Sequence, residues 1–170
     1  PAKGQKTLES AVAGLLDTMA PAMLVFVPTW NGYRRLLPGS YAPTRVSWGH
    51  NNRSVAVRIP AGDGAAMRIE HRIAGADANP YLVLAAILAG MLDGIEGGRT
   101  PPPPTDRNAY EAPAPQLPDQ MDEAVRLFKN SDFIRRTFGV EYRAMFAAIK
   151  DAEIAAFRSE ISPLERSTYL

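Results

Sequence analysis

Two segments of alternating side chains constrain the fold of this chain more than any other feature. Across residues 55–59, aliphatic side chains alternate with smaller or charged ones, and across residues 67–73, charged side chains alternate with Ile69 and His71. Successive side chains of a strand face opposite sides of a sheet, so each segment predicts a half-buried strand. The Gly-Asp-Gly sequence at residues 62–64 predicts a turn that joins the two strands into an antiparallel hairpin.

One face of this hairpin is predicted to hold an excess of positive charge. A symmetric register places Arg58 opposite Arg68 and Ala56 opposite Glu70, and Arg72 points to the same side. Three cations and one anion do not cancel, and like charges held so close are unfavourable unless an anion lies among them. The pattern therefore indicates an anionic ligand on this face. Cross-strand ion pairs on a solvated face are the alternative interpretation.

The distribution of charge along the chain agrees with an anionic ligand. The 170 residues carry a formal net charge of +1, but residues 34–72 hold seven arginines against only Asp63 and Glu70. That segment therefore carries +5 and leaves −4 for the rest of the chain. Arginine suits forked contacts with carboxylate or phosphate groups. The sequence has no basic helix and no RNA-binding aromatic motif, so a small anion is favoured over nucleic acid.

Composition excludes several other classes of protein. A hydrophobic content of 46% with 22% charged residues is typical of a globular chain. The absence of cysteine excludes a disulfide framework, a thiolate metal site and a cysteine nucleophile. The apolar run at residues 80–92 is too short to cross a bilayer, and the N-terminus shows no signal-peptide pattern. We therefore expect a soluble, cytoplasmic protein without a membrane partner.

Helical patterns dominate the remainder of the chain. Residues 8–23 predict an amphipathic helix that ends near Pro21, and residues 24–30 an extended segment. Asn79 and Pro80 predict the start of a helix that is apolar almost all round and is expected to lie inside the fold. A Pro-rich irregular stretch follows at residues 97–118. Two or three amphipathic helices complete the prediction, at about residues 121–129, 131–138 and 140–160. The expected fold class is α+β, an antiparallel sheet segment followed by a helical tail.

Four motifs together resemble one protein family. NGYRRLLPGSYAP, NNRSVAVRIP, RIEHR and ANPYLVLAAILAGMLDGIE are similar, in order and spacing, to the C-terminal half of the catalytic domain of the glutamine synthetase family. The similarity covers residues 29–96. It implies that residues 1–110 form the C-terminal part of that domain and residues 111–170 its helical tail. The family's N-terminal domain and the upstream half of its active site are absent from this sequence, and full-length members assemble as homo-oligomeric stacked rings.

The resemblance also implies a reaction and site residues. Enzymes of this family use ATP to phosphorylate the side-chain carboxylate of glutamate, after which ammonia or a primary amine displaces the phosphate. The similarity implies that Arg35 and Arg72 bind glutamate, that Arg53, Arg58 and Arg68 bind ATP phosphates, that Arg53 and Arg72 act in catalysis, and that Glu70 binds one of two Mg²⁺ or Mn²⁺ ions. The charge pattern and the resemblance both indicate that the RIEHR strand binds metal and phosphate. One carboxylate cannot hold a metal pair, so the isolated chain is expected to be inactive.

The acceptor flap departs from the usual family pattern. The flap comprises residues 39–43. Glutamine synthetases usually read PGYEAP where this chain has Gly-Ser-Tyr-Ala-Pro, so Tyr41 replaces the glutamate that binds ammonium. No Asp or Glu occurs between Leu36 and Gly62. This flap resembles γ-glutamylpolyamine (γ-glutamylputrescine) synthetase-like members, which predicts an amine acceptor larger than ammonia. An ordinary glutamine synthetase, and a non-catalytic phosphate-binding or assembly module, are the alternatives.

Three further residues, two histidines and one tyrosine, have both a functional and a structural interpretation. His50 and His71 are expected to be structural, since His71 lies on the face opposite Glu70. TDRNAYEAP resembles the loop that carries an adenylylated tyrosine, here Tyr110, in some bacterial glutamine synthetases. An unmodified surface loop is the preferred interpretation of that segment.

Overall fold

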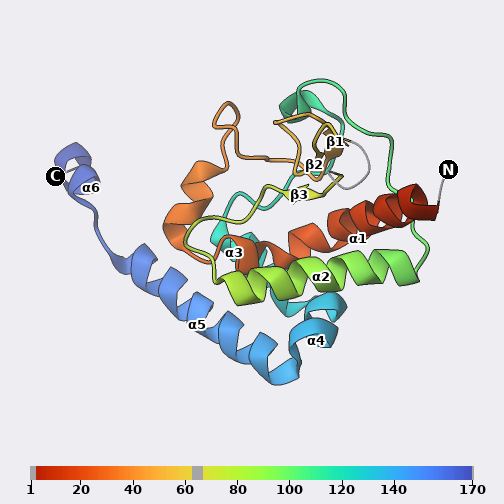
Figure 1. Cartoon of the computed structure of the whole chain (residues 1–170). Helices are drawn as coiled ribbons and strands as arrows, with labels where there is room; N and C mark the ends of the chain where they lie inside the picture. Colours follow the sequence, from red (N-terminus) through yellow and green to blue (C-terminus); the bar gives the residue numbers. More distant parts are fainter. Residues whose placement is uncertain (1–2, 63–66, 170) are drawn as a thin grey trace.

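A small sheet and a set of C-terminal helices lie on either side of two long central helices (Figure 1). The computed structural model describes residues 3–62 and 67–169. Helices α1 (Lys3–Phe26) and α2 (Pro80–Glu96) run side by side through the middle. The expected mixture of helices with a small sheet is confirmed.

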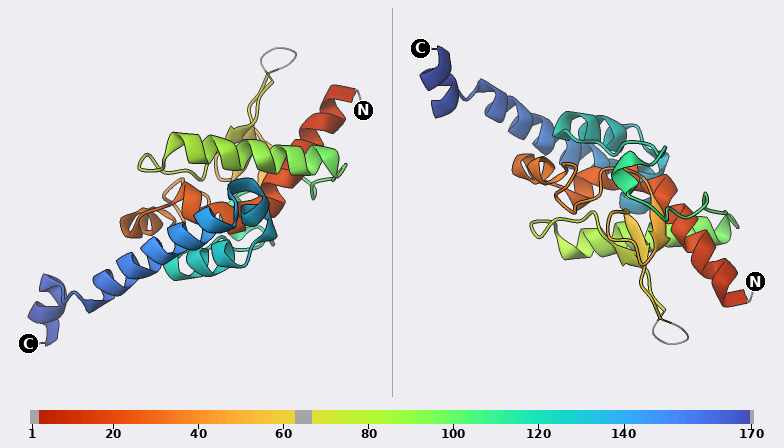
Figure 2. Two further views of the ribbon diagram at one scale, coloured as in Figure 1. Left: turned by 90° about the horizontal axis from the view of Figure 1, so that it is seen from below. Right: turned by 90° about the horizontal axis from the view of Figure 1, so that it is seen from above.

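The sheet has three short strands in the order β1 (Trp48–His50), β2 (Val57–Ile59) and β3 (Glu70–His71). Strands β2 and β3 pair antiparallel, as predicted, whereas β1, which was not predicted, pairs parallel to β2. The predicted turn falls partly on residues 63–66, which lie outside the described residues. Both arms of the hairpin project from the body of the molecule (Figure 2).

The predicted register of the hairpin is wrong by two residues. Arg58 lies opposite Glu70 and Val57 opposite His71. Arg72 N donates to Ala56 O at 3.0 Å, so Ala56 does not face Glu70. The observed pairing sets opposite charges across from each other, where the predicted one would have set Arg58 against Arg68. A shift of two residues preserves parity, so the side chains keep their predicted faces.

Helix α1 extends beyond its predicted end. It continues through Pro21 to Phe26, so residues 24–26, which were expected to be extended, are helical. Met23, Leu24, Val25 and Phe26 are each at most 2% exposed, and this burial outweighs the local preference of proline to end a helix. Residues 4–26 are long and apolar enough to cross a membrane, but 72% of the most apolar window is buried inside the fold, as in a core helix.

Three glycines let α1 and α2 cross at backbone contact. A Cβ atom on Gly14 would lie 2.1 Å from Gly90 O, and one on Gly94 would lie 2.1 Å from Ser10 O. Such distances exclude any side chain at these positions without movement of the main chain. The glycines therefore set the separation of the two helices that support the sheet.

Helix α2 begins as predicted but is not buried on all sides. The Asn79 side chain accepts hydrogen bonds from Tyr81 N and Leu82 N, with Pro80 in the first turn. Its outer face leaves Tyr81, Leu84, Leu88 and Leu92 between 54% and 81% exposed. The expectation that this helix lies inside the fold is wrong for this chain. An apolar surface favours burial, but its composition does not show whether the same chain supplies the residues that bury it.

The three predicted C-terminal helices are present as α3 (Met121–Lys129), α4 (Asp132–Phe138) and α5 (Val140–Ser159). Ion pairs Lys129–Asp151 and Arg158–Asp122 join α3 to α5. A further helix, α6 (Pro163–Tyr169), was not predicted and extends away from the body (Figure 2). In the described connecting segments, η1 (Trp30–Arg35) and η3 (Ala109–Glu111) are 3-10 helices, and η3 interrupts the irregular Pro-rich stretch.

Candidate functional site

A carboxylate between two guanidinium groups forms the centre of the candidate site. Arg58 Nη1 lies 3.0 Å from Glu70 Oε2, and Arg72 Nε lies 3.1 Å from Glu70 Oε1. The two arginine side chains are only 15% and 16% exposed, and that of Glu70 is 35% exposed. These three residues lie together as the hairpin pattern predicted. Arg68 is exposed and lies two residues before Glu70, in the segment that leads into β3.

Arg72 also holds the main chain of two other segments. Its guanidinium donates to Val55 O at 3.1 Å, to Tyr41 O at 3.4 Å and to Arg53 O. Hydrogen bonds from a charged donor are stronger than neutral ones. Arg72 therefore links the strand, the flap and the loop before β2, a structural task that the sequence did not indicate.

Arg35 lies at the end of η1, just before the flap. Its Nη2 donates to Ile73 O, directly beyond β3, while the residue as a whole is exposed. Thr29 caps η1 by accepting a hydrogen bond from Gly32 N. The short helix thus brings Arg35 beside the segment that carries Glu70 and Arg72.

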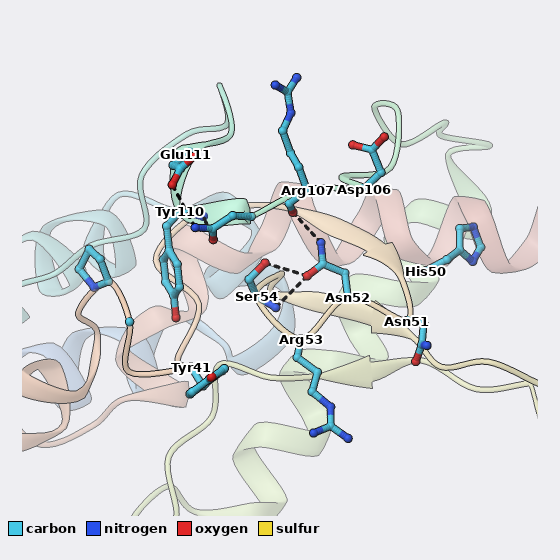
Figure 3. A pocket seen from close by; sticks show the side chains of 13 residues that line it. Tyr41, His50, Asn51, Asn52, Arg53, Ser54, Asp106, Arg107, Tyr110 and Glu111 are labelled. Carbon is cyan, nitrogen blue, oxygen red and sulfur yellow. Dashed lines mark hydrogen bonds between the residues drawn. The ribbon is translucent and has the colours of Figure 1, made fainter.

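An open pocket of about 920 Å³ lies between the flap, residues 50–54 and residues 106–111 (Figure 3). Tyr41 lines it and is 74% exposed, with a positive φ of 61°. The exposed Arg53 side chain points away from residues 106–111 (Figure 3). Within the described parts of the chain, its guanidinium has no hydrogen bond or ion pair, so it is available to an anion.

The loop at residues 105–111 belongs to the pocket although the sequence did not place it there. Asn52 Nδ2 donates to Thr105 O and Arg107 O at 3.0 and 2.8 Å, and Ala109 N donates to Ser54 Oγ at 2.9 Å. Asp106 and Glu111 come with the loop and line the same pocket as Tyr41. The only sequence signal for this loop was the TDRNAYEAP motif.

The two histidines take different positions. His71 packs on Phe26 with ring centroids 4.5 Å apart, on the face of β3 opposite Glu70. Burial lowers the pKa of His71 to about 4, so its ring is neutral at neutral pH. His50 is exposed, lines the pocket and lies edge-on to Trp48. These positions agree with a structural role for His71.

The described residues do not by themselves fit a pair of metal ions. Across residues 3–62 and 67–169, no group of three or more His, Cys, Asp and Glu side chains is placed to hold a metal. Both oxygens of Glu70 are engaged by arginines. The described residues therefore offer the Glu70 carboxylate to such a site, and further ligands would have to come from elsewhere.

Comparison with known proteins identifies the family. The family model described as "Glutamine synthetase, catalytic domain" matches residues 1–169, so the chain belongs to the family of glutamine synthetase catalytic domains. Gamma-glutamylputrescine synthetase PuuA of Escherichia coli is 41% identical over 158 residues, which cover 93% of this chain and 34% of that protein. Gamma-glutamylethanolamide synthetase GlnA4 of Streptomyces coelicolor is 38% identical, over 91% of this chain and 33% of that protein.

Solved structures share the same fold. A structure described as "GmaS/ADP complex-Conformation 1" superposes with a TM-score of 0.85 at 34% identity, over 96% of this chain and 39% of that one. The chain thus spans about a third of the length of the curated relatives it matches. The resemblance inferred from the four motifs is confirmed.

Proposed function

We propose that this chain is the C-terminal part of the catalytic domain of an ATP-dependent glutamate–amine ligase whose acceptor is larger than ammonia. In this proposal residues 1–110 carry the site and residues 111–170 form the tail of the same domain. The observation that carries the proposal is the position of Tyr41, exposed in the same pocket as Arg53 where the family usually has a flap glutamate. Two relatives named for γ-glutamyl amides of putrescine and ethanolamine support it.

The first proposed step is phosphoryl transfer. A γ-carboxylate oxygen of glutamate attacks the γ-phosphorus of ATP, the bond to the bridging oxygen breaks, and γ-glutamyl phosphate and ADP form. Arg53, Arg58 and Arg68 bind the phosphates, and Arg35 binds the glutamate α-carboxylate. Positioned cations that meet the developing charge supply most of the catalysis in such reactions. The Arg53 guanidinium lines the pocket without a partner among residues 3–62 and 67–169, which suits this task.

Arg72 is proposed to act beside the glutamate side chain and the transferred phosphoryl group. Its bonds to Glu70 and to three main-chain carbonyls fix its position before any substrate binds. Such preorganisation costs no rearrangement during the reaction. Glu70 would serve as one ligand of Mg²⁺ or Mn²⁺, with the other ligands supplied by the remainder of the whole protein.

The second proposed step transfers the acyl group. The amine nitrogen attacks the γ-carbonyl carbon and loses a proton, the bond to phosphate breaks, and a γ-glutamyl amide and inorganic phosphate result. The Tyr41 ring offers apolar contact to an aliphatic amine and a π face to a cationic one. Burying four methylene groups, at roughly 0.8 kcal/mol each, favours a diamine over ammonia by about two powers of ten even at partial burial. Assembly into stacked rings in the cytoplasm is part of the same proposal.

Acceptor competition in the full-length protein that carries this chain tests the proposal. Phosphate release is measured with ATP, glutamate, Mg²⁺ or Mn²⁺, and one of putrescine, ethanolamine, methylamine or ammonia. The expected result is a higher kcat/KM for putrescine-like amines than for ammonia, and a lower preference in Tyr41→Glu. The matched control is Tyr81→Glu on the exposed face of α2.

Two results would overturn the proposal in different ways. A higher kcat/KM for ammonia, unchanged in Tyr41→Glu, would assign the protein to the ordinary glutamine synthetases. No phosphate release with any acceptor, together with retained nucleotide binding, would favour a non-catalytic phosphate-binding module. The 170-residue chain alone is expected to be inactive and serves as the blank.

A further inference from the structure

The acceptor flap has a backbone geometry that must be held in place. Gly39 and Tyr41 have φ angles of 84° and 61°. A glycine adopts this left-handed region freely, but a tyrosine does so only at some cost and needs surrounding structure to hold it. Ser40 holds the flap from within, since its Oγ shares its single hydrogen between Arg35 O and Leu37 O and accepts a hydrogen bond from Ala42 N.

A distant tyrosine braces the flap from outside. Tyr110 Oη donates a hydrogen bond at 3.0 Å to Ala42 O, the carbonyl oxygen of the residue that follows Tyr41. The two residues are 68 positions apart in the sequence, and Figure 3 shows the Tyr110 ring reaching from its loop down towards the level of Tyr41. This carbonyl belongs to the peptide between Ala42 and Pro43, so the hydrogen bond holds the end of the flap that directly follows Tyr41.

Tyr110 is itself fixed by its surroundings. The Asn108 side chain accepts a hydrogen bond from Tyr110 N at 3.2 Å and so caps η3. Arg45, which follows the flap, donates from Nε to Tyr110 O and from Nη1 to Ala114 O, both at 2.9 Å. The hydroxyl group therefore has a defined position relative to the segment that leaves the flap.

The same loop holds the segment that carries Arg53. Asn52 donates to two carbonyls of the loop, and its Oδ1 accepts from Ser54 N and Ser54 Oγ at 2.9 and 2.7 Å. The loop at residues 105–111 thus bridges the flap on one side of the pocket and the Arg53 segment on the other.

We propose that Tyr110 is a positioning residue for acceptor selection: its hydroxyl holds Ala42 O and thereby keeps Tyr41 in the left-handed conformation that faces the pocket. The expected effect on the amine KM rests on the proposed function, whereas the expected effect on the flap conformation does not. Tyr110 itself need not touch the amine, because it acts through the flap.

Hydrogen exchange tests the structural part in the full-length protein. In Tyr110→Phe, the flap amides of Ser40 and Ala42 are expected to exchange about fivefold faster, as follows from the loss of one hydrogen bond of ordinary strength. Tyr142→Phe is the matched control, because it removes a hydroxyl from a tyrosine of α5 that packs between the rings of Phe138 and Phe146, and it should leave flap exchange unchanged. Equal flap exchange in both variants would overturn the inference, whether or not any ligase activity is found.

Kinetics test the consequence for acceptor choice. In Tyr110→Phe, KM for the amine is expected to rise by up to about fivefold, while KM for ATP and glutamate stays within about twofold, because only the flap loses a hydrogen bond. Arg45→Lys, which loses the planar fork to Tyr110 O and Ala114 O, is expected to shift the amine KM in the same direction. An equal loss for all three substrates in both variants would mean a general structural role and overturn the inference. Failure of the wild type with every amine would instead count against the proposed function alone.

Discussion

Arg58 on β2 lies opposite Glu70 on β3, and Arg58 Nη1 forms an ion pair with Glu70 Oε2 at 3.0 Å. The same carboxylate receives Arg72 at 3.1 Å, so one anion compensates two largely buried cations. Removing one member of a buried charge group leaves the others without compensation and is strongly unfavourable. The stability of the sheet and the arrangement of the candidate site therefore depend on the same carboxylate.

Replacing Glu70 by Gln is expected to lower the free energy of unfolding by about 1–3 kcal/mol, since two guanidinium groups lose a charged acceptor. Urea denaturation of the chain measures the change. Glu123→Gln is the matched control, because its pair with Arg126 is 3.8 Å long and mostly exposed, and should cost less than about 0.5 kcal/mol. Similar losses in the two variants would contradict the buried character of the Glu70 cluster.

The sequence predicted which side chains share a face but not which residues pair. Arg58, Glu70 and Arg72 share a face because strand parity depends only on counting, and a shift of two residues leaves parity intact. The register depends on the conformation of the connecting loop, which its Gly and Ala content leaves open. The start of α2 at Asn79 and Pro80 was predictable because a helix cap is local.

A second prediction concerns the crossing of α1 and α2. Gly94→Ala would place a Cβ atom 2.1 Å from Ser10 O and 2.6 Å from Gly14 N, both main-chain atoms that cannot rotate away. The helices must move apart, so we expect a loss of about 2–3 kcal/mol. Gly4→Ala, in α1, where nothing lies within 4 Å of the new methyl group, is the control and should be neutral or stabilising by up to about 1 kcal/mol. Thermal unfolding of the two variants would contradict this prediction if their midpoints shifted alike.

The parts of the site that the sequence missed depend on contacts between distant segments. Tyr110 and Ala42 are 68 residues apart, and no periodicity or local motif relates them. The exposed face of α2 could not be predicted either, because Leu84 and Leu88 have the same composition whether or not another segment covers them. Patterns along one element predict faces and ends, and they carry no information about which elements meet.

A third prediction concerns Tyr33, which is 6% exposed and whose hydroxyl has no hydrogen-bond partner within the described chain. Burial raises the pKa of this phenol above its ordinary value. Stability should be unaffected below about pH 10 and should fall as the pH rises further, since only the unfolded chain then loses the proton readily. Tyr33→Phe should remove the part of this alkaline loss that Tyr33 causes, leaving the part due to Tyr142, whose pKa burial also raises. It should also stabilise the protein by about 1 kcal/mol at neutral pH.

Urea unfolding on both sides of about pH 10 tests this prediction for Tyr33. Tyr81→Phe, at a position 81% exposed, is the control and should change neither quantity. A loss of stability in Tyr33→Phe at neutral pH would mean that the hydroxyl has a partner after all.

The last prediction concerns Arg53 in the full-length protein and rests on the proposed function. Its guanidinium lies in the pocket without a partner among the described residues, so it can meet negative charge that grows during phosphoryl transfer. One such donor is worth roughly 3–4 kcal/mol, so Arg53→Ala is expected to lower kcat by about a hundred- to a thousandfold. KM for ATP should change by no more than about threefold, because the contact strengthens only in the transition state. Steady-state kinetics of this variant are compared with those of Arg126→Ala, an exposed arginine on α3. A rise in KM for ATP with an unchanged kcat would make Arg53 a residue of ground-state binding. The role in phosphoryl transfer would then be assigned to Arg72.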